Sequence, residues 1–160
     1  MTPMRVDFYE RVWMWAAGIL IVLFLATLAY ATVAQGIRPP SHIETINPRA
    51  VFDDARFAER GVTRKADGGA VVIAIAMTFA FQPAEIRVPA NRPVTFRITS
   101  SDVQHGFQIV GTNANTMVIP GYVSEFTTVF QHPGEYLIVC NEFCGVGHHM
   151  MSGKLIVEAP

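Results

Sequence analysis

The residues best suited to chemistry in this 160-residue sequence lie in one short stretch near the C-terminus, CNEFCGVGHHMM. Its two cysteines, Cys140 and Cys144, are the only ones in the chain, and they are four residues apart. His148 follows the second cysteine by four residues, and Met151 follows that histidine by three. Thiolate, imidazole and thioether groups form a soft ligand set, which favours copper over hard cations such as magnesium or calcium. The stretch is therefore a candidate copper site.

Two other uses of the cysteine pair remain open on spacing alone. A short disulfide would leave His148 and Met151 without a role. Zinc rarely accepts a thioether, and a closed zinc site usually has a second Cys/His pair at short spacing. Glycines at 145 and 147 allow the loop to curl so that several side chains face one point. His149 lies beside His148 and is the first substitute if the ligand assignment is displaced by one residue.

A second imidazole is available far upstream, at His105. It alternates in register with Phe107 and Ile109, so it is predicted to point to the apolar face of a strand. A histidine in this position is by default a hydrogen-bonded core residue. The cysteine-rich loop, however, supplies only one firmly placed imidazole, and a β-sandwich can bring an earlier strand end beside a late loop. On the residues alone, His105 can therefore be either a core histidine or a metal ligand.

Residues 70–160 have the pattern of an all-β domain. Residues such as Ile86 and Val88, or Val94, Phe96 and Ile98, alternate with polar neighbours, which is typical of half-buried strands. Turn signals separate about eight such segments, at 71–78, 85–88, 94–99, 104–110, 115–119, 123–130, 135–140 and 153–158. This number of short strands indicates a β-sandwich of the Greek-key type.

Residues 12–34 are predicted to form a transmembrane anchor. They carry no charge, and the aromatic residues Trp13, Trp15 and Tyr30 stand near the two ends. A cleaved signal peptide is the alternative, but its apolar part is usually shorter, about 7–15 residues. Arg5 and Arg11 precede the segment, so residues 1–11 are expected in the cytoplasm and the β-domain outside, at the plasma membrane.

Residues 35–69 are predicted to be a linker, with at most one helix. They contain Pro39-Pro40, Asn47-Pro48, scattered charges and Gly68-Gly69. The net charge of the whole chain is −1, which argues against a nucleic-acid-binding protein.

At these residues the sequence resembles subunit II of the haem-copper cytochrome c oxidases, more closely the short kind with a single membrane anchor. The pattern Cys-x-Glu-x-Cys-x3-His-x2-Met at 140–151 is the family's signature for the dinuclear copper centre called CuA. The resemblance extends upstream through Phe79-Ala80-Phe81-Gln82-Pro83, Asp102-Val103-Gln104-His105-Gly106-Phe107 and Pro120-Gly121, and so covers about residues 70–158. It implies a cupredoxin-like fold for the sandwich.

The resemblance also implies a role for each ligand residue. Cys140 and Cys144 would bridge two copper ions, and His105 and His148 would each bind one. Met151 would be a weak thioether ligand, and Glu142 would bind through its backbone carbonyl. In the family the side chain at the position of Glu142 also binds a magnesium ion at a subunit interface, so magnesium is a possible second metal. Phe79 and Phe81 are candidates for an apolar surface that receives the electron donor, with packing in the core as the alternative.

By resemblance, the chain is the electron-entry subunit of a terminal oxidase. A soluble cytochrome c or a cupredoxin would donate electrons, and a large haem-bearing membrane subunit, subunit I, would accept them and reduce oxygen to water with proton pumping. The chain itself would have no substrate-converting site. Two alternatives remain open: a copper subunit of a nitric oxide reductase, and a membrane-tethered copper-binding or copper-delivery protein.

Overall fold

The structure, a computed structural model, describes residues 7–34 and 44–159. Residues 1–6 of the predicted cytoplasmic segment and residues 35–43 of the predicted linker lie outside these described residues. The chain divides into two compact units, Met1–Ser41 and His42–Pro160, which are described separately below.

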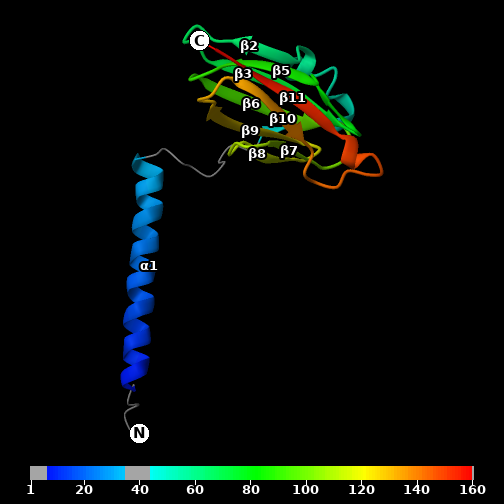
Figure 1. Cartoon of the computed structure of the whole chain (residues 1–160). Coiled ribbons are helices and arrows are strands. Elements are labelled where there is room, and N and C mark those ends of the chain that lie inside the picture. Colours follow the sequence, from blue (N-terminus) through cyan, green and yellow to red (C-terminus); the bar gives the residue numbers. More distant parts are fainter. Residues whose placement is uncertain (1–6, 35–43, 160) are drawn as a thin grey trace. The chain divides into compact units, whose positions relative to one another are not determined.

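The first unit contains one long helix, α1 (Phe8–Ala34), drawn in blue in Figure 1. It begins four residues before the predicted anchor because Asp7 closes its N-terminus. The Asp7 carboxylate accepts a hydrogen bond from the N–H of Phe8 at 2.7 Å, and the Asp7 carbonyl accepts one from Arg11 at 3.0 Å. A negative side chain is favourable at this end of a helix. The helix is long and apolar enough to cross a membrane.

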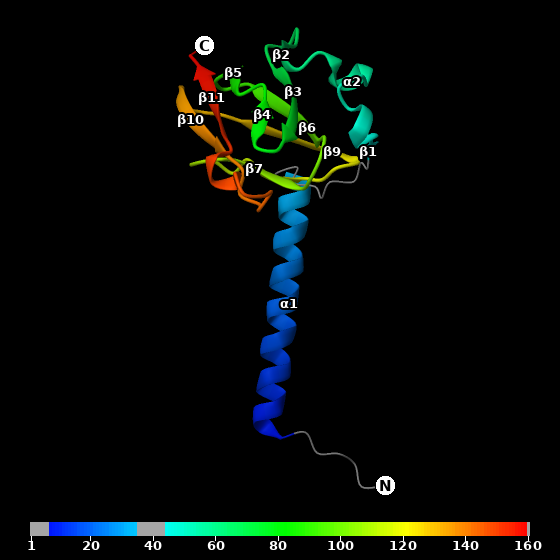
Figure 2. The same cartoon turned by 90° about the vertical axis from the view of Figure 1, so that its right-hand side faces the viewer.

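The second unit is a sandwich of two sheets that face each other (Figure 2). The larger sheet has the strand order β1-β9-β6-β3-β2, with β4 paired to β3, and the smaller sheet has the order β5-β11-β10-β7-β8. The strands of the larger sheet are β1 (Glu44–Thr45), β2 (Gly61–Arg64), β3 (Ala70–Met77), β4 (Ala80–Gln82), β6 (Pro93–Ser100) and β9 (Tyr122–Val129). Those of the smaller sheet are β5 (Glu85–Pro89), β7 (His105–Ile109), β8 (Asn115–Val118), β10 (Gly134–Val139) and β11 (Ser152–Glu158).

Most neighbours in the two sheets are antiparallel, but two pairs are parallel. β3 pairs with β6 from Ala70↔Val94 to Ala76↔Ser100, and β11 pairs with β5 from Lys154↔Glu85 to Glu158↔Pro89. Alternate residues of each strand point inward and form the core between the sheets, which includes Phe96, Phe107 and Leu155. The predicted all-β, cupredoxin-like sandwich is confirmed, and a loop at one end of it has a rigid support.

Residues 44–64 do not behave as the predicted linker. Besides β1 and β2 they form a short 3-10 helix, η1 (Pro48–Ala50), and one turn of helix, α2 (Ala55–Ala58), which covers the outer side of the larger sheet (Figure 2). Ile46, Val51 and Phe57 are buried there against Ile75 and Val123. The physical reason is that these apolar side chains remove the outer face of the sheet from water, which a solvated connector would leave exposed.

Ion pairs connect the segment 44–64 to β6 of the larger sheet. The Glu44 carboxylate receives Nη1 of Arg56 at 2.5 Å and also receives Arg97 of β6, which in turn pairs with Glu125. Burial raises the pKa of Glu44, but the hydrogen bonds and charges of Arg97 and Arg56 outweigh it, so the pKa of Glu44 is lowered overall.

Candidate metal centre

The loop between β10 and β11, orange-red in Figure 1, carries five of the six predicted metal ligands. The N–H of Cys140 donates to the carbonyl of Met151 at 3.3 Å, which closes the base of the loop. Gly145 has a φ of +130°, a conformation that residues with a side chain rarely adopt. A short 3-10 helix, η2 (His148–Met150), follows and turns the chain back into β11. This backbone brings residues eleven positions apart to one place.

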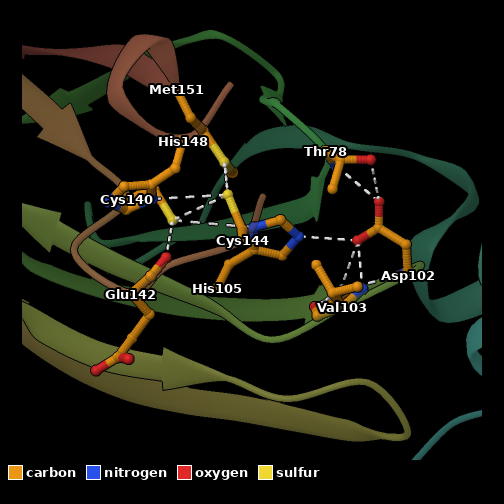
Figure 3. A network of polar contacts seen from close by, with 10 residues as sticks. Thr78, Asp102, Val103, His105, Cys140, Glu142, Cys144, His148 and Met151 are labelled. Atoms are coloured by element: carbon orange, nitrogen blue, oxygen red, sulfur yellow. Dashed lines mark hydrogen bonds and ion pairs between the residues drawn. The ribbon is translucent and has the colours of Figure 1, made fainter. Parts of the chain in front are cut away.

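The predicted ligand side chains point toward one another (Figure 3). The two cysteine Sγ atoms are 3.9 Å apart. His105 Nδ1 lies 3.9 Å from Cys140 Sγ, and His148 Nδ1 lies 3.7 Å from Cys144 Sγ. Met151 Sδ is 3.7 Å from Cys144 Sγ, and the Glu142 carbonyl oxygen is 3.1 Å from Cys140 Sγ. The structure thus places the other four predicted ligands around the cysteine pair.

His105 comes from the start of β7, and an aspartate fixes its orientation. Its Nε2 lies 2.8 Å from Asp102 Oδ1. A carboxylate only accepts hydrogen bonds, so Nε2 carries the proton and Nδ1 keeps its lone pair toward the sulfurs. Histidine ligands of metals are usually held in this way by a carboxylate or carbonyl.

Asp102 is itself held by the turn between β3 and β4. Thr78 donates from its backbone N–H at 2.7 Å and from its hydroxyl at 2.8 Å to Oδ2, and the N–H of Val103 donates to Oδ1 at 2.6 Å. Burial raises the pKa of Asp102, but the hydrogen bonds from His105, Thr78 and Val103 prevail and lower it to about 2. Asp102 therefore remains an anion at any physiological pH.

The cysteines are buried, with only 6% and 7% of their surfaces exposed. Burial, and to a smaller extent the neighbouring Cys140 thiol, raise the pKa of Cys144 to about 11. In the metal-free chain Cys144 is therefore protonated at neutral pH. Binding of a metal by its thiolate must release this proton.

This donor set fits copper better than the alternatives. The cysteines are free, and their separation of 3.9 Å is far from the roughly 2.05 Å of a disulfide. A closed zinc site uses four ligands, rarely including a thioether. Here two thiols, two imidazoles and a carbonyl oxygen are joined by Met151, which is only 2% exposed and directed at Cys144. So many donors, mostly soft, suit copper in an enclosed site.

The structure changes the interpretation of several neighbouring residues. Phe81 is only 2% exposed and packs edge-on against Phe107 in the core, so the prediction that it receives a donor is wrong. Phe79 is half-buried. His149 is exposed beside the cluster, whereas the carboxylate of Glu142 points away from the sulfurs (Figure 3).

Two functional residues, Asp102 and Thr78, were missed by the sequence reasoning. Asp102 stands three residues before His105, a spacing that was a weak available signal for a carboxylate partner. Thr78 is 24 residues away in sequence from the carboxylate it binds, so no local pattern identifies it.

The loop itself carries exposed apolar side chains. Phe143 is 79%, Val146 89% and Met150 68% exposed, and the ring of Phe143 lies 5.8 Å from that of His148. Large apolar side chains with this much exposure often mark a contact surface.

Comparisons with known proteins agree with this geometry. Residues 77–159 match the family described as cytochrome c oxidase subunit II, periplasmic domain. The chain is 37% identical to cytochrome c oxidase subunit 2 of Thermus thermophilus, over 94% of this chain and 92% of that protein. Among solved structures, a chain of a heme-copper terminal oxidase dimer has a TM-score of 0.76 and 35% identity, over 94% of this chain and 99% of that one. The periplasmic domain of subunit II of cytochrome oxidase from Bradyrhizobium japonicum shares the fold, with a TM-score of 0.51 and 22% identity over 60% of this chain and 87% of that one.

Proposed function

The chain belongs to the cytochrome c oxidase subunit II family, and on this premise we propose that its cysteine loop and His105 hold a dinuclear copper centre through which electrons enter a haem-copper oxidase. The chain is a membrane-anchored subunit of such an oxidase, with its β-domain outside the cytoplasm. The matched relatives are oxidase subunits, and no observation favours a nitric oxide reductase subunit or a copper-delivery protein.

One observation supports two copper ions rather than one: each cysteine sulfur has an imidazole of its own. His105 faces Cys140 at 3.9 Å, and His148 faces Cys144 at 3.7 Å, while the two sulfurs lie between them. Met151 and the Glu142 carbonyl then provide one further donor on each side. A bound copper pair of this kind would accept and release single electrons.

The protein contributes a fixed and dry set of ligands. Asp102 keeps the proton of His105 on Nε2, and burial of the cysteines keeps water from the sulfurs. Both strands that flank the loop belong to a five-stranded sheet, so the ligands have little freedom to move when the charge of the site changes. Small displacement of ligands favours rapid electron exchange.

We propose that the electron donor docks on the exposed apolar side chains around the loop, namely Phe143, Val146 and Met150. The ring of Phe143 lies beside His148, so a donor on this surface would come close to a ligand. Phe79, predicted as a second contact, is half-buried and remains a weaker candidate. Because the surface is apolar, binding of a soluble cytochrome c or cupredoxin should depend only weakly on salt.

The orientation and the magnesium site are also proposals. Arg5 and Arg11, which precede the uncharged segment 12–34, favour an N-terminus in the cytoplasm, with the large haem-bearing subunit I beside the anchor in the lipid. The carboxylate of Glu142, directed away from the sulfurs, is free to bind magnesium where this chain meets that subunit.

The dinuclear proposal is tested on the full chain in detergent. We expect metal analysis to find two coppers per chain, and electron paramagnetic resonance to show an unpaired electron shared by two equivalent copper nuclei. Cys140→Ser and Cys144→Ser should each abolish the shared pattern, because a bridge needs both thiolates. A spectrum in which wild-type protein confines the electron to one copper would contradict the proposal.

A further inference from the structure

The ring of Phe79 lies directly beneath the backbone of the ligand loop. A Cβ atom added to Gly147 would lie 2.5 Å from Cδ2, 2.7 Å from Cγ and 2.8 Å from Cε2 of Phe79. A Cβ atom added to Gly145 would lie 3.1 Å from Cε1 and 3.2 Å from Cζ of the same ring. The ring therefore fills the space of two missing side chains, between Cys144 and His148.

Phe79 has little freedom to leave this position. It occupies the two-residue turn between β3 and β4, whose flanking residues Met77 and Ala80 are paired across the hairpin. It packs against the main core, and the other residue of the turn, Thr78, is bound twice to Asp102.

The same short turn thus contacts both halves of the ligand set. Through Thr78 and Asp102 it fixes His105, which comes from β7, and through the Phe79 ring it supports the loop that carries Cys144 and His148. A change at this turn would alter the position of one half relative to the other.

We propose that Phe79 is a positioning residue for the copper site: its ring holds the Cys144–His148 loop in the metal-binding conformation before metal arrives, and Gly145 and Gly147 are glycines because the ring takes the place of their side chains. The inference deepens the proposed copper function and rests on the loop being the source of ligands. It assigns Phe79 a task inside the protein besides the donor contact predicted for it.

The first test uses the metal-free full chain, so its outcome does not depend on copper. Cys140 and Cys144 are buried, and a thiol reagent can reach them only when the loop opens. Phe79→Leu removes the flat ring but keeps an apolar side chain, and should raise the rate of thiol labelling by about tenfold. Phe126→Leu is the matched control, because Phe126 is also half-buried against the same core but lies on β9 and stacks on Phe96.

The control should leave the labelling rate within about twofold of wild type under native conditions, since it destabilises the core without touching the loop. Equal acceleration by Phe79→Leu and Phe126→Leu, or acceleration by neither, would overturn the proposal. Failure to bind two coppers with the labelling difference intact would instead count against the dinuclear centre alone.

The second test exchanges volume between the two partners. Gly147→Ala should accelerate labelling and, in copper-loaded chain, change the copper hyperfine pattern, because its Cβ would collide with the ring. Adding Phe79→Ala to Gly147→Ala should bring both readouts back toward wild type, because the new methyl group occupies part of the vacated space. If the two changes add without any such rescue, the ring and the glycine are not partners and the proposal fails.

Discussion

Replacing Asp102 by asparagine should weaken copper binding through the proton of His105. Asparagine has nearly the shape of aspartate, but one of its two oxygens becomes an amide nitrogen that donates hydrogen bonds. If that nitrogen takes the place of Oδ1, His105 Nε2 must accept from it, and the imidazole proton moves to Nδ1. The lone pair that faces Cys140 is then lost.

The opposite orientation of the amide is also unfavourable. The nitrogen would then take the place of Oδ2 and face the backbone N–H of Thr78, a donor 2.7 Å away that cannot rotate. In either orientation the amide nitrogen faces a backbone donor, which is the N–H of Val103 at the Oδ1 position and the N–H of Thr78 at the Oδ2 position. A hydrogen bond to a charged group is worth about 1.5–3 kcal/mol, and since 30% of the Asp102 side chain is exposed, water replaces part of it. We expect a loss of about 1–2 kcal/mol in the free energy of unfolding of the metal-free chain.

The effect on copper should be of similar size or larger. Loss of the group that orients a metal-binding histidine typically costs about 10–100-fold in metal affinity. Competition with a copper chelator, followed by the optical absorption of the copper–thiolate bonds, would measure it. Asp67→Asn is the matched control. Asp67 also accepts a hydrogen bond from a backbone N–H, that of Gly69 at 2.8 Å, but it lies before the start of β3, at the opposite end of that strand from Thr78. If Asp102→Asn retains copper as firmly as Asp67→Asn does, Asp102 does not control the His105 tautomer.

Four further outcomes are expected. Met151→Leu should keep copper bound but shift its reduction potential, because a weak thioether ligand affects the potential of the copper more than its affinity. Loss of all copper in a metal assay would contradict this role. His148→Ala should destroy the site while His149→Ala changes copper content by less than about twofold; the reverse result would mean that the assigned register is wrong by one residue. The lowered pKa of Glu44 means that its ion pairs stabilise the fold above the carboxyl's unfolded pKa and are lost as pH falls through the lower folded value; Glu44→Gln should therefore show a smaller loss of melting temperature than wild type between neutral pH and about pH 3, and equal losses would refute it. Gly18→Leu should reduce the amount of subunit I recovered with the chain after detergent extraction and sizing, since Gly18 opens an apolar groove on α1; unchanged recovery would place the helix contact elsewhere.

The strands that build the sandwich were predictable because burial alternates along them. β5 shows it plainly: Glu85 and Arg87 are exposed, and Ile86 and Val88 are buried. β1, β2 and β4 have only two to four residues each, too few for a period of two to appear. The segment 44–64 was assigned to the linker for a related reason, because its buried apolar residues are separated by charged ones and follow no period.

The ligand loop was predictable from sequence because its donors are neighbours in the chain. Prediction failed where contacts between residues distant in the sequence determine a role, as for Phe79 and Phe81. Phe79 and Phe81 were predicted together, either as a donor surface or as core residues. Phe79 lies in the turn and supports the loop, and only Phe81 follows the strand into the core. The contact of Thr78 with Asp102 depends on the parallel pairing of β3 with β6, in which Ala76 lies opposite Ser100, and no local pattern reveals such a pairing.

The parallel pairing of β11 with β5 also has a consequence for how the protein matures. Lys154 lies opposite Glu85, and Leu155 opposite Ile86, so β11 closes onto a strand that was synthesised almost seventy residues earlier. Such distant contacts form late, because a long stretch of chain must first be confined. The ligand loop is held on one side by β11, so it cannot take shape before that strand has been synthesised and paired. If the loop holds copper as proposed, the metal has to be supplied after β11 has paired with β5.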